Sequence, residues 1–203
     1  HDNSINVLVP SLSMVEELEW YNFKNLKVWT RGVDTELFNP NKRNRNDNDI
    51  QLTYVGRVAI EKNIEEFLTL KGNYNKTVVG DGPELQKYIN KYPDVNFVGL
   101  KRGNELAEYY ANADVFVFPS KTDTLGNVIL EALACGTPIA AFPVTGPKDI
   151  LKDSKINTLD DRLGNSVEKA LKVNRNDCRE FAMKFTWEDC ANEFLDSQID
   201  SKN

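Results

Sequence analysis

The chain has 203 residues, a net charge of −6, 40% hydrophobic and 28% charged side chains, as expected for one globular domain of ordinary size plus appendages. Its 25 Lys and Arg are spread along the sequence, and no apolar run approaches the roughly 20 residues that span a bilayer, so neither a nucleic-acid-binding stripe nor a membrane-spanning helix is indicated. The only His is His1, which argues against His-based triads and His-ligated metals, and three Cys without CxxC spacing favour reduced core thiols over a zinc site.

The first 38 residues predict a strand in INVLVP, an amphipathic helix around residues 11–21 and an extended VWTRGVD segment. They lack an initiator Met and the apolar run of a signal peptide. We therefore expect residues 1–38 to be the tail of a preceding domain and a linker. The polar run NPNKRNRNDNDI at 39–50 predicts a mobile surface loop.

Short apolar runs then alternate with segments of helical periodicity. The predicted strands are 51–56, 76–82, 95–99, 114–120 and 137–143, and the predicted helices are 62–72, 83–92, 103–113 and 126–136. Strands that are apolar on both faces and alternate with helices predict βαβ units in a parallel sheet. The sequence thus predicts a doubly wound, Rossmann-like α/β domain over residues 39–185.

The end of the chain predicts further helices. TGPKD at 145–149 is taken as a structural turn, and residues 160–173 and 175–199 have helical spacing. Thr186 resembles an N-cap that opens a last helix, assigned to residues 186–203. We expect its apolar face to pack toward a domain missing from this chain; the face comprises Trp187, Cys190, Ala191 and Phe194.

Loops that follow parallel strands collect at one edge of the sheet and form a ligand crevice. The loop GRVAIEKNI carries Gly56, Arg57 and Lys62, whose small residue and two cations suit a diphosphate, although a solvated basic turn is the alternative. GDGPE at 80–84 lacks the spacing of a dinucleotide fingerprint, which favours a tight turn. VGLKRGNEL at 98–106 either reads a base through its backbone or simply connects a strand to a helix.

The segment from Asp123 to Glu131 places one carboxylate at the end of a buried strand and another eight positions later on the following helix. Between them TLGN offers backbone N–H groups at a helix N-terminus, which attracts phosphate. Two acids and an anion cradle suit a sugar nucleotide. The alternative is that Asp123 caps a turn and Glu131 is an exposed helix residue. Tyr109, Tyr110 and the aromatic residues of 116–118 have core-like spacing and are assigned to packing.

Six ordered motifs together resemble the C-terminal half of retaining family-four glycosyltransferases of α-mannosyltransferase-like type, over residues 4–197. They are RGVDTELFNP, YVGRVAIEKNI, VVGDGPE, VNFVG, ADVFVFPSKTDTLGNVILEALACGTPIAA and FTWEDCANEF. The resemblance implies that this chain is the nucleotide-sugar-binding domain of a two-domain glycosyltransferase B fold.

The resemblance also implies a role for each matching residue. Arg57 and Lys62, next to Gly56, resemble the diphosphate-binding pair, and Glu131 resembles the carboxylate that binds ribose. Asp123 replaces the first Glu of the E-x7-E motif and would contact the donor hexose with a carboxylate one methylene shorter. Backbone N–H groups for the sugar and phosphate would come from Thr124, Leu125, Gly126 and Asn127. Gly99 and Leu100 match the loop beside the nucleobase.

The implied activity is transfer of a mannose- or glucose-like hexose from a UDP- or GDP-sugar to a glycan or glycolipid, with Arg57, Lys62, Asp123 and Glu131 as catalytic residues. No cofactor and no metal are expected, and nucleic acid is not an expected partner. An N-terminal domain missing here would bind the acceptor, so we expect this chain to bind donor without efficient transfer. The resemblance also implies a cytoplasmic enzyme of envelope glycan synthesis, with peripheral association at the inner membrane face.

Two other functions stay open from the sequence. A non-catalytic nucleotide-sugar-binding module would keep the fold without an acceptor domain. An enzyme like the UDP-N-acetylglucosamine epimerase is weaker, because those enzymes depend on His and other acids absent here.

Overall fold

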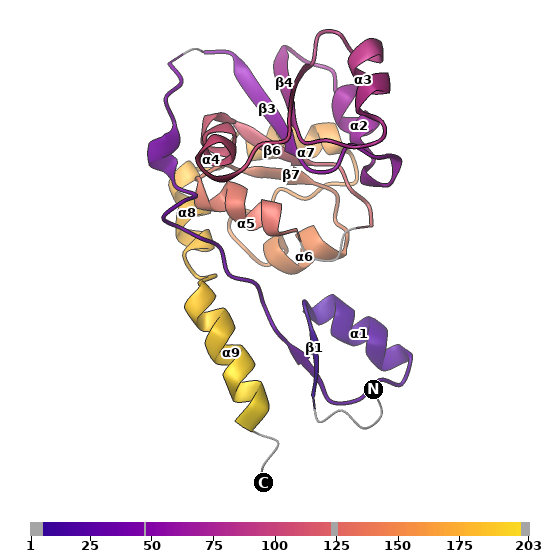
Figure 1. Ribbon diagram of the computed structural model, residues 1–203, viewed down its shortest axis with the longest axis vertical. Helices are drawn as coiled ribbons and strands as arrows, with labels where there is room; N and C mark the ends of the chain where they lie inside the picture. The colour runs from indigo at the N-terminus through magenta and orange to yellow at the C-terminus, as the bar shows by residue number, and fades with distance from the viewer. Residues whose placement is uncertain (1–5, 47, 123–125, 200–203) are drawn as a thin grey trace.

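The computed structural model describes residues 6–46, 48–122 and 126–199 and is built around one parallel sheet (Figure 1). Five strands form it in the order β5-β4-β3-β6-β7, and each neighbouring pair is parallel. Their bounds are β3 Ile50–Val55, β4 Tyr74–Val79, β5 Asn96–Gly99, β6 Val115–Phe118 and β7 Ile139–Ala141. The strand order reverses at β3, because β6 returns to the side of β3 opposite β4. The predicted Rossmann-like doubly wound sheet is confirmed, and this reversal is where such sheets bind ligands.

Helices cover both faces of the sheet, and each face has its own core. On β6, Phe116 and Phe118 pack toward α4, α5 and α8, whereas Val115 and Val117 pack toward α2, α3 and α7. The helix bounds are α2 Ile64–Leu68, α3 Leu85–Lys91, α4 Gly103–Asn112, α5 Asn127–Ala134, α7 Leu163–Ala170 and α8 Arg175–Ala182. A strand buried on both sides explains the uninterrupted apolar run of β6.

A smaller group of elements lies beside the sheet domain (Figure 1). Strands β1 Val7–Val9 and β2 Leu26–Val28 pair in parallel and flank α1 Leu12–Trp20. The last helix, α9 Trp187–Ile199, lies against the residues that follow β2: the Trp29 indole donates to the Cys190 carbonyl at 2.9 Å, and Thr30 bonds to Glu193. The N–H of Asp189 donates to Thr186 Oγ1 at 3.0 Å, which confirms the predicted N-cap.

The predicted apolar face of α9 is only partly covered. Cys190 is buried, but Trp187 and Phe194 are 53% and 41% exposed. At the other boundary, Val33 and Phe38 pack into the core on the α5 side of the sheet. The domain limits at residues 38 and 186 stay predictions.

The predicted turn at 145–149 is wrong, because these residues begin a helix, α6 Thr145–Leu151. Gly146 and Pro147 occupy its first turn, where backbone N–H groups have no partner within the helix, so proline is tolerated there. Ile150 and Leu151 then enter the core and fix the helix.

The predicted mobile loop is also wrong for residues 39–46. A 3₁₀-helix, η1 Pro40–Lys42, is capped by Asn39, and the next two arginines are anchored. Arg43 and Arg45 pair with Asp114 at 2.8 and 3.0 Å, at the start of β6. This polar run is therefore fixed to the amino edge of the sheet.

Arginine side chains close the C-terminal ends of α4 and α5. Arg175 donates to the carbonyls of Ala111 and Ala113 at 2.8 and 2.7 Å, and Arg179 donates to that of Ala134 at 2.8 Å. The last carbonyls of a helix have no partner within it, so these guanidiniums satisfy them. Burial lowers the pKa of Arg175 to about 10, so it stays charged at neutral pH.

The loops after β3 and β4 approach so closely that Gly80 has no room for a side chain. A Cβ there would lie 1.9 Å from the Gly56 carbonyl oxygen, and φ is +146°. We expect Gly80→Ala to lower the free energy of unfolding by about 2–4 kcal/mol, measured by urea unfolding. The control is Gly164→Ala in α7, where nothing lies within 4 Å and a gain of about 0.5–1 kcal/mol is expected. Equal midpoints for the two variants would contradict this reading.

Asp114 gives the fold a defined pH dependence. Burial works to raise its pKa, but the Gln51 N–H and the guanidiniums of Arg43 and Arg45 outweigh it and hold the pKa below its ordinary value. The resulting stabilisation is present above the unfolded-state pKa of about 3.9 and is lost as pH falls through the folded-state pKa. We expect Asp114→Asn to lower the free energy of unfolding by about 1–3 kcal/mol at neutral pH. The difference from wild type should shrink in acid, whereas Asp94→Asn, at an exposed carboxylate, should unfold like wild type throughout. Wild-type stability of Asp114→Asn at neutral pH would refute the role.

Candidate functional site

The loops after β3, β4 and β5 are hydrogen-bonded to one another at the carboxyl edge of the sheet. The N–H of Gly56 donates to the Val79 carbonyl at 3.0 Å, and that of Gly80 donates to the Gly99 carbonyl at 2.9 Å. Two predicted site residues, Gly56 and Gly99, thus lie at the same edge.

Arg57 has a fixed backbone and an available side chain. The Tyr54 hydroxyl donates to its carbonyl at 2.8 Å, while its guanidinium, 64% exposed, lies 3.2 Å from the 55% exposed Glu61 carboxylate. An exposed pair of this kind contributes about 0–1 kcal/mol, so the guanidinium can exchange Glu61 for another anion at little cost. Lys62 is half-buried at the end of the 3₁₀-helix η2 Ile60–Lys62, in the same loop.

Asn63 links this loop to the end of β6. Its backbone is left-handed, with φ of 50°, and its side-chain amide donates to the Pro119 carbonyl at 3.0 Å. The loop with Arg57 and Lys62 is therefore held beside the strand that leads to the acidic segment. Asn63 was not among the predicted site residues, although Asn is one of the few residues that readily adopt this conformation.

Part of the acidic segment lies outside the described residues, namely Asp123, Thr124 and Leu125. Gly126 follows as the N-cap of α5 and Asn127 is the exposed first residue of that helix. Gly126 supplies no side-chain cap, so the first N–H groups of α5 have no capping side chain and lie at the positive end of the helix dipole. This geometry suits an anion.

Glu131 lies one turn after Asn127 on α5 and is half-buried, so the alternative reading of it as an exposed helix residue is wrong. Its Oε2 accepts a 2.8 Å hydrogen bond from the Tyr110 hydroxyl. Burial raises the pKa of Glu131, and the bond from Tyr110 opposes that rise. The predicted packing role of Tyr110 is confirmed, but its hydroxyl has a second role that periodicity alone does not reveal.

The loop after β5 presents its backbone at the same edge. Gly99 has φ of +73° and open space around the position of a Cβ, and Leu100 is 61% exposed. A left-handed glycine beside an exposed apolar side chain suits contact with a planar base. Ser120, just after β6, is buried, and its hydroxyl has no hydrogen-bond partner in the described part of the chain.

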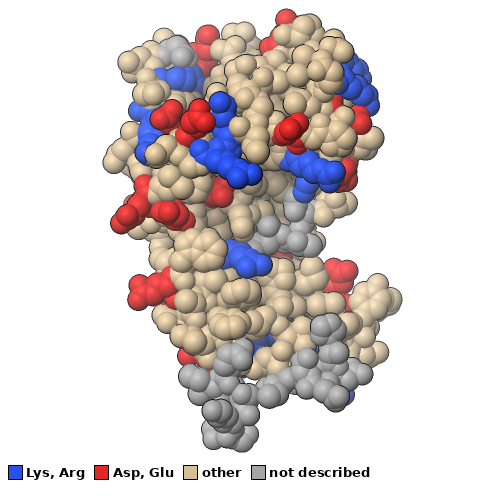
Figure 2. All heavy atoms as spheres, in the orientation of Figure 1, with Lys and Arg blue, Asp and Glu red and all other residues tan. Residues whose placement is uncertain are grey.

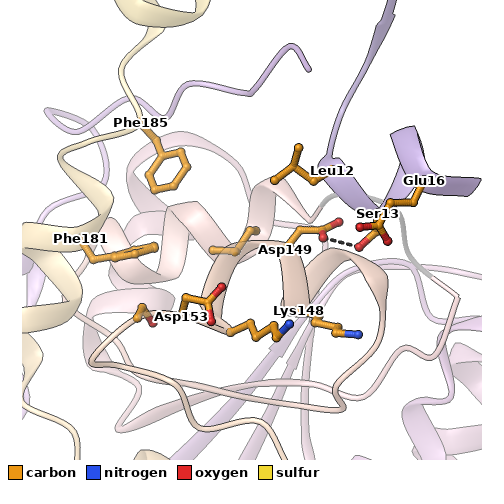
Figure 3. Close-up of a pocket in the computed structure, with 11 residues that line it drawn as sticks. Leu12, Ser13, Glu16, Lys148, Asp149, Asp153, Phe181 and Phe185 are labelled. Atoms are coloured by element: carbon orange, nitrogen blue, oxygen red, sulfur yellow. Dashed lines mark hydrogen bonds between the residues drawn. The ribbon is translucent and has the colours of Figure 1, made fainter. Parts of the chain in front are cut away.

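A cavity of about 420 Å³ lies elsewhere, between α1, α6 and the end of α8. Figure 3 shows Ser13 and Glu16 of α1 on one side of it and Phe181 and Phe185 on the other, with Asp149 between them bonded to Ser13. None of the predicted site residues that the structure describes lines this cavity.

Other features limit what kinds of site the described residues form. On the face shown in Figure 2, basic and acidic side chains are interspersed. No helix among the described residues is long and apolar enough to cross a membrane, and they contain no group of three His, Cys, Asp or Glu suited to a metal ion. The three Cys are reduced and buried, as predicted, and burial raises the pKa of Cys135 and Cys178 to about 12.

In comparisons with known proteins, a family model matches the part of the chain that contains the five-stranded sheet. Residues 36–184 match the family model described as glycosyl transferases group 1. The chain is 33% identical over 168 residues to a GDP-mannose-dependent alpha-mannosyltransferase of Mycobacterium tuberculosis, which covers 78% of this chain and 44% of that protein. It is 34% identical over 163 residues to the protein of the same name from Corynebacterium glutamicum, covering 75% and 40%. The chain therefore spans less than half the length of these relatives.

Solved structures share the fold. A sucrose-phosphate synthase from Thermosynechococcus elongatus superposes with a TM-score of 0.84 at 25% identity, over 99% of this chain and 60% of that one. The Anabaena protein HepE, in complex with UDP and glucose, superposes with a TM-score of 0.75 at 16% identity, over 97% and 64%.

Proposed function

This chain belongs to the group 1 glycosyltransferase family, and from that premise we propose that it is the donor-binding part of a retaining hexosyltransferase. The observation that carries the proposal is the convergence of Gly56, Arg57 and Gly99 at one edge of the sheet, linked through Asn63 to the strand that leads into α5. In this proposal cations, helix N–H groups and a carboxylate would contact one ligand, as a nucleoside diphosphate sugar requires.

Each part of the donor has a candidate partner. The diphosphate would contact Arg57, Lys62 and the N–H groups at Gly126 and Asn127. Glu131 would accept hydrogen bonds from the ribose hydroxyls, and Gly99 with Leu100 would border the base. Contact of Asp123 with the hexose, and of Thr124 and Leu125 with the sugar and phosphate, stays a prediction.

The proposed chemistry is electrostatic. The bond from the anomeric carbon to the diphosphate oxygen breaks, a bond to the acceptor hydroxyl oxygen forms on the same face, and the acceptor proton passes to the leaving diphosphate. Arg57, Lys62 and the N-terminal end of α5 would stabilise the charge that develops on that leaving group. The acceptor would bind to a part of the enzyme that this chain, spanning less than half of its relatives, does not include. No metal is needed in this scheme.

GDP-mannose is the first candidate donor, because two relatives named for that donor are 33% and 34% identical to the chain. We expect GDP-mannose at one hundred times its dissociation constant to stabilise the chain by about 2.7 kcal/mol. At about 2–4 °C per kcal/mol this raises the melting temperature by about 5–11 °C in a thermal-shift assay. UDP-glucose and ADP-glucose, tested in parallel, should give smaller shifts. A larger shift with UDP-glucose would reassign the base, and no shift with any of the three would remove the proposal.

Two substitutions test the site by titration calorimetry with the preferred nucleoside diphosphate. Arg57→Ala and Glu131→Gln each remove one charge-assisted contact, which costs about 1.5–3 kcal/mol, or roughly 10- to 150-fold in the dissociation constant. Two control variants remove exposed charges outside the proposed site: Lys172→Ala removes a positive charge, as Arg57→Ala does, and Glu108→Gln removes a negative charge, as Glu131→Gln does. Both controls should bind like wild type. Wild-type affinity in both site variants would show that the site is wrongly assigned.

A further inference from the structure

Tyr110 is held rigidly in the core between α4 and the sheet. Its side chain is fully buried, and its ring meets Phe38 and Phe116 edge-on, with centroids 5.9 and 5.5 Å away. Thr137 Oγ1 donates to its backbone carbonyl at 2.6 Å. Ring and backbone are therefore both fixed, and the direction of the hydroxyl is fixed with them.

The hydroxyl of a buried tyrosine requires a hydrogen-bond partner, and here that partner is Glu131. Tyr110 is also the one hydrogen-bond partner of the Glu131 side chain within the described residues. A carboxylate offers about four acceptor positions on two oxygens, and Tyr110 occupies one of them. The remaining positions have no hydrogen-bond partner in the described part of the chain, and in the proposed site they would accept bonds from the ligand.

We propose that Tyr110 is a positioning residue of the donor site, whose buried hydroxyl fixes the Glu131 carboxylate in the orientation that accepts hydrogen bonds from the vicinal ribose hydroxyls. This inference rests on the proposed function, because it assigns Glu131 to the ribose. A ligand diol meets an acceptor that is already oriented, so less conformational freedom is lost on binding. Tyr110 itself lies in the core and would touch no donor atom.

The same hydrogen bond favours the ionised form of Glu131 over the protonated form. Burial disfavours the charged carboxylate and raises its pKa, while the bond from Tyr110 works in the opposite direction. Burial and the Glu131 charge raise the pKa of Tyr110 well above its ordinary value, so the phenol keeps its proton near neutral pH. Removal of the hydroxyl must therefore raise the pKa of Glu131 further.

Among the described residues, few other groups can titrate beside this pair. Cys135, at the end of α5, interacts with both, but burial raises its pKa to about 12, so it stays neutral. The cations that face this thiol from neighbouring elements are Lys42, Arg175 and Arg179. Below neutral pH, Glu131 is the member of this cluster that changes charge.

The test compares Tyr110→Phe with Tyr109→Phe, which removes the same atom from the same helix at a residue that lines a different cavity, together with Gln51 and Thr53. Titration calorimetry with GDP and UDP would run from about pH 5 to about pH 8. Ribose binding needs ionised Glu131, so affinity falls as pH falls, and in Tyr110→Phe this fall should begin at a higher pH. At neutral pH we expect Tyr110→Phe to bind roughly 5- to 30-fold more weakly, and Tyr109→Phe to match wild type.

A 2′-deoxynucleoside diphosphate separates positioning from general loosening. Wild type should prefer GDP to 2′-deoxy-GDP, and Tyr110→Phe should lose most of that preference, because the hydroxyl acts through the ribose contact. An unchanged preference and pH profile in Tyr110→Phe would overturn the inference and leave the proposed function intact. Absence of binding by wild type would instead remove the proposed function.

If Tyr110→Phe does not fold, an NMR experiment on the wild-type protein still tests the role of Tyr110. The phenolic proton of Tyr110, observed by NMR, should shift on titration of Glu131 and again on addition of GDP. A resonance that GDP leaves unchanged would overturn the inference.

Discussion

The close backbone approach at the carboxyl edge of the sheet is the constraint on which the candidate site depends. Gly80 passes so near the Gly56 carbonyl that only a hydrogen atom fits between them, and its N–H at the same time bonds to Gly99. The carboxyl ends of β3, β4 and β5 are thereby held in fixed positions relative to one another. Because Arg57 follows Gly56 directly, backbone contacts, and not its own side chain, set the position of its Cα relative to the loop that contains Gly99. The flexible Arg57 side chain thus projects from a rigid loop backbone.

The amino edge of the sheet is held by ion pairs and hydrogen bonds of charged side chains. Asp114 collects two guanidiniums and a backbone N–H at the start of β6, and Arg175 caps the C-terminal end of α4. These contacts fix the amino end of β6 and the C-terminal end of α4. Since Tyr110 lies on the last turns of α4, the position of its hydroxyl depends on this anchoring. The end of α4 that Arg175 caps is therefore also the end that carries the tyrosine bonded to Glu131.

The sequence was sufficient for the sheet because each buried strand is a short apolar run followed by turn residues, as in VFVF before Pro119. It was insufficient where distant contacts decide the local structure. The Gly-Pro pair of α6 is equally typical of a turn, and burial of Ile150 and Leu151 decides for helix. The polarity of residues 39–46 indicates a loop, but their partner Asp114 lies some seventy positions later. Periodicity placed Tyr110 in the core correctly and could not identify Glu131 as the acceptor for its hydroxyl.

The two ends of the proposed donor site differ in how far they are organised before a ligand arrives. Glu131 is half-buried and held by a fixed phenol, whereas Arg57 is exposed and paired only with another exposed side chain. Ordering a long free side chain costs up to about 1.5–2 kcal/mol, so the diphosphate end loses more entropy on binding than the ribose end. Binding of the nucleoside would then fix the position of the whole donor in the site. The exposed Arg57 guanidinium would follow the charge as it grows on the leaving diphosphate, which is where stabilisation accelerates transfer.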